Sequence, residues 1–187
     1  MRKHPDYSAE LLYKMMMPDY IINMSKYHHV KLDLDLPASY PPVDGYQQLT
    51  METRLLAIVD IYQALVGKRA YKKSWAAPAS MQYIDQLAGI EYDQEVWDDF
   101  YQVMGRFPIG SLVQLNDGSQ AFVPNVPEQD LDRPQVVIVK NAAGEDLIHQ
   151  IFADLQVEKD LSIKKGLDNQ AVFGEDLLDV FTNLRIS

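Results

Sequence analysis

Histidine side chains near the start of the chain are the residues best suited to chemistry. Three of the four histidines, His4, His28 and His29, fall within the first 29 residues, and the chain has no cysteine. Imidazole and carboxylate ligands without thiolate suit iron, manganese or zinc. Adjacent residues of a regular helix diverge by roughly 100°, so His28 and His29 can share one ion only at a fraying helix end. On spacing alone, surface histidines remain the alternative, and His149, in a predicted strand, is taken as structural.

Asp60 is the carboxylate that stands out from its surroundings. It lies in the segment LLAIVDIY, residues 55–62, which predicts a helix that is apolar on nearly all sides. A carboxylate buried in such a helix is costly unless a cation, a metal or hydrogen-bond donors compensate it. Two interpretations follow. Asp60 is either a metal ligand, or an aspartate that pairs with a buried arginine or caps a neighbouring helix.

A basic run follows the Asp60 helix directly. The segment GKRAYKK, residues 67–73, holds four of the 17 lysines and arginines of an otherwise acidic chain. Such a run suits phosphate, because an arginine such as Arg69 can bind two oxygens at once. The alternative is an ordinary solvated surface.

Composition limits the classes of partner and compartment. A net charge of −10 argues against binding to nucleic-acid polymers, which needs a basic footprint, but allows a small anionic ligand in a local basic pocket. The absence of cysteine favours a reducing cytoplasm. The longest apolar run is too short to span a bilayer and the first residues are polar, so we expect no membrane association.

The spacing of apolar residues divides the chain into two halves, one with a helical period and one with a strand period. Apolar spacing predicts helices that begin near Pro5, Ile21, Thr50, Pro78 and Asp93, with a proline-rich loop over residues 30–49. The second helix is expected to reach His28 and His29. Strands are predicted at 111–115, 120–126, 134–140, 148–155 and 162–165, the first two as a hairpin around Asp117-Gly118, and a short helix at 175–184. The sequence therefore predicts an α+β chain: a partial helical bundle over residues 1–107, then a small antiparallel β module over residues 108–187.

Taken in order, several motifs of the helical half resemble the HD-GYP family of bacterial cyclic di-GMP phosphodiesterases. The segment HPDYS, residues 4–8, is similar to the family element HPxxG. HHVKLD at 28–33 and SYP at 39–41 resemble the two ends of HHExxDGxGYP. RLLAIVDIYQAL at 54–65 resembles RILxIADxYDAL, and RAYK at 69–72 resembles the RPYx that follows it. The resemblance covers roughly residues 1–115 and implies an HD-domain-like bundle.

The resemblance also implies a site and a reaction. The implied metal ligands are His4, His28, His29 and Asp60. The residues implied to lie near the phosphates of a cyclic dinucleotide are Tyr40, Arg69 and Lys72. A di- or trinuclear centre of a divalent transition metal, iron or manganese, would activate water for hydrolysis of the phosphodiester.

The chain departs from the family pattern at several positions. The His-Asp pair that names the family and supplies the bridging aspartate precedes the HPxxG element, whereas three residues precede His4 here and no His-Asp dipeptide occurs in the chain. Val30 stands for the motif glutamate, and Leu34 and Ser39 stand for glycines. A loop poor in glycine adopts left-handed turns only at a cost. Further along, Gln63 replaces the second aspartate of RILxIADxYDAL.

These features together predict a degenerate or truncated HD-GYP protein of cyclic di-GMP signalling. The chain alone is expected to bind metal weakly or not at all and to be inactive in hydrolysis. Two alternatives stay open: a non-enzymatic interaction module, or half of an enzyme that an upstream segment or a separate chain completes. The apolar helical half further predicts a homodimer, or a complex with another protein.

Overall fold

The structure is a computed structural model that describes residues 2–67 and 74–173. Two compact units make up the chain. Unit 1 comprises Met1–Ala64 and Tyr83–Phe100, and unit 2 comprises Leu65–Gln82 and Tyr101–Ser187. Arg69, Lys72 and the helix predicted at 175–184 lie outside the described residues. The predicted boundary near residue 107 stays a prediction.

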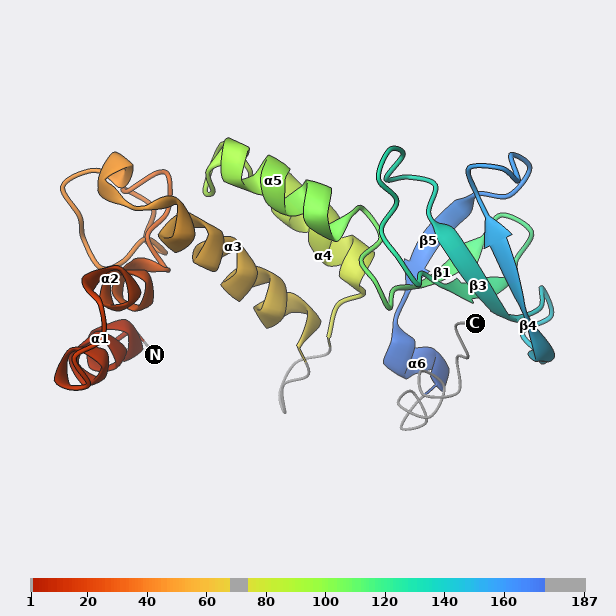
Figure 1. The fold of residues 1–187 in the computed structure, drawn as a ribbon, viewed down its shortest axis with the longest axis horizontal. Helices are drawn as coiled ribbons and strands as arrows, with labels where there is room; N and C mark the ends of the chain where they lie inside the picture. Colours follow the sequence, from red (N-terminus) through yellow and green to blue (C-terminus); the bar gives the residue numbers. More distant parts are fainter. Residues whose placement is uncertain (1, 68–73, 174–187) are drawn as a thin grey trace. The chain divides into compact units, whose positions relative to one another are not determined.

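The described part of the chain before the sheet is mainly helical, and local signals mark the ends of the α-helices (Figure 1). They are α1 (His4–Lys14), α2 (Asp19–Tyr27), α3 (Met51–Val66), α4 (Ala77–Asp85) and α5 (Gln94–Met104). The α3 N-terminus is capped by Thr50, whose Oγ1 accepts a 3.4 Å hydrogen bond from the Thr53 amide. Asp93 caps α5 in the same way, because its Oδ1 accepts from the amides of Glu95 and Val96.

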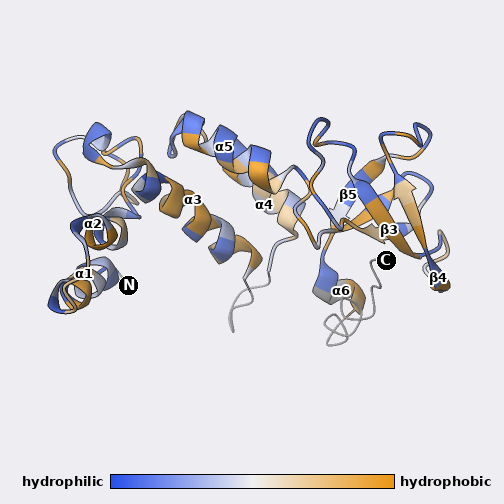
Figure 2. Ribbon diagram, in the orientation of Figure 1, coloured by the Kyte–Doolittle hydropathy of each residue, from blue (hydrophilic) through white to orange (hydrophobic). Residues whose placement is uncertain are grey.

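Unit 1 is joined internally by polar and aromatic contacts between α3, α4 and α5. Arg54 on α3 pairs with Asp93 at 2.8 Å, and both side chains are about 15% exposed (16% and 15%). The indole of Trp97 on α5 donates to Asp85 on α4 at 2.9 Å. Figure 2 shows α5 with hydrophilic and hydrophobic colours on different sides, as expected for a helix that packs on one face.

Unit 2 contains a five-stranded antiparallel sheet with strand order β4-β3-β2-β1-β5. Its strands are β1 (Leu112–Leu115), β2 (Gln120–Phe122), β3 (Gln135–Lys140), β4 (Asp146–Asp154) and β5 (Ile163–Leu167). In the β1–β2 turn, Asp117 accepts hydrogen bonds from the amide and hydroxyl of Ser119, and Gly118 has φ 94°. This turn is the predicted Asp-Gly hairpin.

Each face of the sheet carries its own apolar cluster. One face buries Val113, Leu115, Val123 and Val136 together with Leu155. The other buries Leu112, Phe122, Val137 and Val139 against Phe173 of a short helix, α6 (Asn169–Phe173). Two buried faces explain why β3 is apolar along nearly its whole length.

The α+β prediction is confirmed by helices followed by an antiparallel sheet. One detail differs from the expectation, because α2 ends at Tyr27 and does not reach the two histidines. Over the described residues, no helix combines the length and the apolar character needed to span a membrane.

Candidate metal centre

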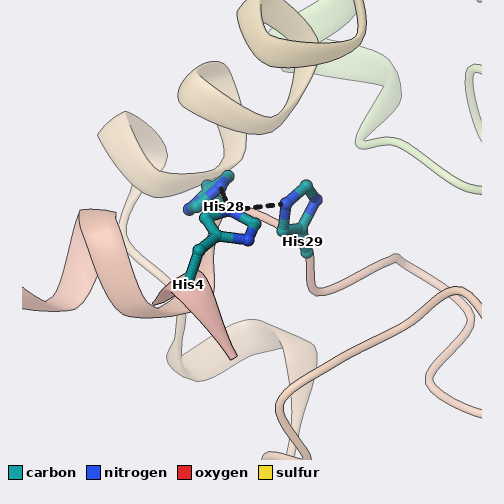
Figure 3. A group of neighbouring side chains, drawn as sticks. All are labelled: His4, His28 and His29. Carbon is teal, nitrogen blue, oxygen red and sulfur yellow. Dashed lines mark hydrogen bonds between the residues drawn. The ribbon is translucent and has the colours of Figure 1, made fainter. Parts of the chain in front are cut away.

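Three imidazole rings converge at one point of unit 1 (Figure 3). The Nε2 atom of His4 lies 3.3 Å from Nε2 of His28 and 3.2 Å from Nε2 of His29. Among the described residues, this is the group of histidine, aspartate and glutamate side chains whose ligand atoms cluster closely enough to hold a metal ion. The predicted His4, His28 and His29 are therefore brought together.

The ends of two adjacent helices position the three rings. His4 is the first residue of α1, and His28 is the C-cap residue of α2. Because the helix stops at Tyr27, His29 is free of helical geometry, and the His28 and His29 ring centroids approach to 4.1 Å. A regular helix would have turned these adjacent side chains apart by roughly 100°. The early end of α2 is thus what allows both rings to face one site.

The nitrogen separations fit a cation bound by the three rings. A tetrahedral ion with Zn–N bonds of about 2.0–2.1 Å requires ligand nitrogens roughly 3.3–3.4 Å apart. The two separations from His4 Nε2 are 3.2 and 3.3 Å, and the ligand atoms of all three rings lie within 4.8 Å of one another. One shared proton on His4 Nε2 cannot form two linear hydrogen bonds, whereas a cation at the centre accepts a lone pair from each ring. The residues present therefore fit a divalent transition ion with an open fourth position.

A backbone carbonyl fixes the orientation and tautomer of His28. Its Nδ1 donates to the Ser25 carbonyl oxygen at 2.7 Å. In the neutral ring, a proton on Nδ1 leaves the lone pair of Nε2 directed at the cluster. The motif comparison gave no indication of Ser25, but the carbonyls of a last helical turn are unpaired and available to a side chain three residues on.

His29 is held neutral and stacked against Tyr40. Burial, followed by the neighbouring His28 ring, lowers the pKa of His29 to about 4, although the Asp60 carboxylate opposes this shift. Its ring therefore keeps a lone pair at neutral pH. The Tyr40 ring stacks on it with centroids 4.7 Å apart and planes 27° apart. The predicted Tyr40 thus lies beside the three histidines.

Asp60 differs from the expectation of a buried carboxylate. Its side chain is 46% exposed, and its Oδ2 lies 3.8 Å from Nδ1 of His29, the nitrogen on the far side of the ring from His4. The alternative of a buried Asp60 does not hold, because the side chain is half exposed, and within the described residues its ion pair is the one with His29. Asp60 is therefore next to the cluster, and its role as a ligand stays a prediction.

The glycine-poor loop after His29 reaches Tyr40 without left-handed residues. Among the described non-glycine residues, Met16 is the one with a positive φ. Ser39, which stands for a motif glycine, accepts the Lys31 amide at 3.1 Å, and the Tyr40 amide donates to the His29 carbonyl at 3.3 Å. These bonds close the loop and hold Tyr40 against His29. The motifs gave no indication that hydrogen bonds of Ser39 and Tyr40 would close this loop in place of glycine turns.

Lys31 fixes the same loop to the segment before α5. Its ammonium is hydrogen-bonded to the Tyr92 hydroxyl, lies 3.9 Å from the centre of the Tyr92 ring and is 3.4 Å from the Glu91 carboxylate. The Leu32 amide donates to the Glu91 carbonyl at 2.8 Å. Burial lowers the pKa of Lys31, and the Glu91 charge opposes that shift. Lys31 therefore serves as an anchor of the loop.

The three converging histidines form a candidate metal site on a helical unit, and sequence comparison assigns the family. A family model described as HD domain matches residues 1–96, about half of the chain. The chain belongs to the HD domain family, and its relatives identify the HD-GYP type.

The curated relatives carry names of cyclic dinucleotide enzymes. The chain is 27% identical over 155 residues to the cyclic di-GMP phosphodiesterase PA4108 of Pseudomonas aeruginosa, covering 82% of this chain and 36% of that protein. It is 25% identical over 134 residues to the cyclic di-GMP phosphodiesterase PdeB of Borreliella burgdorferi, covering 71% and 35%. The cyclic di-GMP phosphodiesterase response regulator RpfG of Xanthomonas campestris is 25% identical over 122 residues, covering 59% and 31%. The chain thus spans about a third of these relatives, and no solved structure matches it significantly.

Proposed function

We propose that this chain acts in cyclic di-GMP signalling by binding a cyclic dinucleotide at a centre that holds one divalent transition ion, iron or manganese by resemblance. The observation that carries the proposal is the convergence of His4, His28 and His29. The relatives named as cyclic di-GMP phosphodiesterases support the choice of ligand.

The residues of the chain would supply binding and orientation. When bound, the ion would polarise a phosphodiester oxygen and lower the pKa of a water molecule. His28 presents its lone pair because the Ser25 carbonyl holds Nδ1. Burial raises the pKa of the Tyr40 hydroxyl, which is protonated at neutral pH and can donate a hydrogen bond to the ligand. Asp60, beside Nδ1 of His29, is proposed as a further ligand or as the carboxylate that orients this ring.

We further propose that the 187 residues by themselves do not hydrolyse the ligand. In-line attack with two ions needs a carboxylate that bridges them. Among the residues that the structure describes, the candidate cluster consists of imidazoles, and Asp60 lies at the remote nitrogen of one of them. The chain contains no His-Asp dipeptide. With one bound ion, no second ion would stabilise the oxygen of the leaving group.

Binding and turnover separate the two parts of this proposal. The manganese-supplemented chain is titrated with cyclic di-GMP by calorimetry, and the same sample is then followed for linear product by chromatography. We expect binding without product. Turnover in the parent chain that disappears in Asp60→Ala would contradict the inactivity, and absence of binding with or without metal would contradict the ligand.

Arg69 and Lys72 are proposed to hold the phosphates, on the strength of the basic run at residues 67–73. An Arg69→Ala, Lys72→Ala double variant should weaken cyclic di-GMP binding and flatten its dependence on salt. Lys14→Ala, which removes an exposed charge on α1, is the matched control. Equal affinities in the parent and the double variant would assign the run to a solvated surface.

An interaction module is the second candidate, because α1 and its C-terminal end expose large apolar side chains. The exposed fractions are 59% for Leu11, 60% for Met15 and 91% for Met16. A groove of about 550 Å³ in the same unit is lined by apolar residues such as Leu12 and Met24 and also by His28 and Asp60. Such a surface fits a homodimer or another protein partner. Light scattering behind size exclusion tests this candidate.

A further inference from the structure

We infer that Arg2 binds a phosphate group of a ligand held at the three-histidine centre, an inference that rests on the proposed function and adds a residue to its site. No motif quoted above includes this arginine. Its place beside the centre, its remaining donors and its charge carry the inference.

The backbone and an aromatic ring hold Arg2 beside the centre. Its Nη2 donates to the Pro37 carbonyl at 2.8 Å, and its guanidinium carbon lies 5.6 Å from the centre of the Tyr40 ring. The Tyr40 ring is in turn 4.7 Å from the ring of His29. These two separations limit the distance from the guanidinium to the His29 ring to about 10 Å. One residue, Lys3, separates Arg2 from His4, so the same stretch of chain carries both groups.

Contacts with the described part of the chain use few of the hydrogen-bond donors of Arg2. A guanidinium has five N–H donors, and the bond to Pro37 uses one of them. The other arginines with described side-chain contacts are committed to the fold. Arg54 and Arg106 pair with aspartates, and Arg133 donates to three carbonyls. Within the described residues, no carboxylate forms an ion pair with Arg2.

An anionic ligand needs a local cation at this place. The chain carries a net charge of −10, so its average field repels a phosphodiester. A guanidinium that is already oriented loses little freedom when it binds, and its fork matches two phosphate oxygens. We therefore expect the ligand to be a phosphodiester. One part of it would bind at the three histidines, and its phosphate oxygens would lie within reach of Arg2.

The test uses a phosphodiester that is not a nucleotide. Bis(4-nitrophenyl) phosphate is titrated by calorimetry into the zinc-loaded and metal-free full chain, as parent, Arg2→Gln, Arg2→Lys and Lys14→Gln. Arg2→Gln should weaken binding about tenfold, the low end for a hydrogen bond to a charged group on an exposed side chain. Arg2→Lys should fall between the parent and Arg2→Gln, and Lys14→Gln should match the parent. Zinc affinity, measured separately, should be the same in all four proteins.

The results distinguish this inference from the proposed function. Equal affinity of the parent and Arg2→Gln for the phosphodiester, or no binding to the parent, overturns the role of Arg2. An Arg2-dependent affinity that persists in a chain binding neither zinc nor cyclic di-GMP upholds Arg2 as a phosphate-binding residue and removes the metal-centred function. Loss of zinc binding in Arg2→Gln would reassign Arg2 to the support of His4 and overturn the inference.

Discussion

Replacing His28 with alanine should remove most of the metal affinity while leaving the fold intact. Sites with four ligands bind zinc with apparent free energies of about 10–16 kcal/mol, or about 2.5–4 kcal/mol per ligand. Three imidazoles at the low end give about 7.5 kcal/mol, a dissociation constant of about 3 µM, which agrees with the weak binding expected from the sequence. With two imidazoles left, about 5 kcal/mol remains, and the dissociation constant rises about 70-fold.

The geometry gives reasons to expect the full loss. His28 Nε2 is 3.3 Å from that of His4, and the Ser25 carbonyl already orients the ring, so no ordering cost offsets the lost bond. Competition against a colorimetric zinc chelator measures the affinity of metal-free protein for zinc. His149→Ala, which removes a histidine of β4 in unit 2, is the control and should match the parent.

Two results would refute the reasoning. A loss smaller than fivefold in His28→Ala would show that the three nitrogens do not share an ion. Two or more tightly bound ions per chain, measured by elemental analysis after purification without chelator, would show that further ligands complete a larger centre. Urea unfolding of both metal-free variants verifies that an altered fold is not the cause of the loss.

Three other predictions concern the surroundings of the centre. Asp60→Asn should weaken zinc binding about 10–100-fold, the range for a group that supports or joins a ligand shell; a change below threefold in the chelator assay would remove Asp60 from the site. Arg54→Met should lower the free energy of unfolding by about 3 kcal/mol in urea titrations, because it leaves Asp93 largely buried without its partner; a loss under 1 kcal/mol would mean that water solvates the pair. The parent chain should self-associate at tens of micromolar, and a Leu11→Glu, Met15→Glu variant should be monomeric by light scattering; a monomeric parent would contradict an interface on α1.

Local chemistry made several elements predictable from the sequence. Thr50 and Asp93 predicted where α3 and α5 begin, because the side chain of an N-cap residue binds backbone amides only two or three residues away. Asp117 and Gly118 predicted the first hairpin, because the contacts that form its turn are also local: Asp117 accepts from the Ser119 amide and Gly118 takes the positive φ. The motifs also indicated which histidines converge. A family pattern identifies the positions that form a site, but it does not give the geometry of that site.

Tertiary packing determined the strand order, the exposure of Asp60 and the convergence of the histidines, which local sequence signals do not specify. The sequence determined the helical half, the β module and the identity of the three histidines. Only the structure placed β5 beside β1 at the edge of the sheet, since pairing over so long a separation depends on the whole module. Apolar neighbours in the sequence suggested a buried Asp60, yet the carboxylate is half exposed, because the burial of a helical position depends on what packs against that side of the helix. The convergence of His4 with His28 likewise required the start of one helix to meet the end of another.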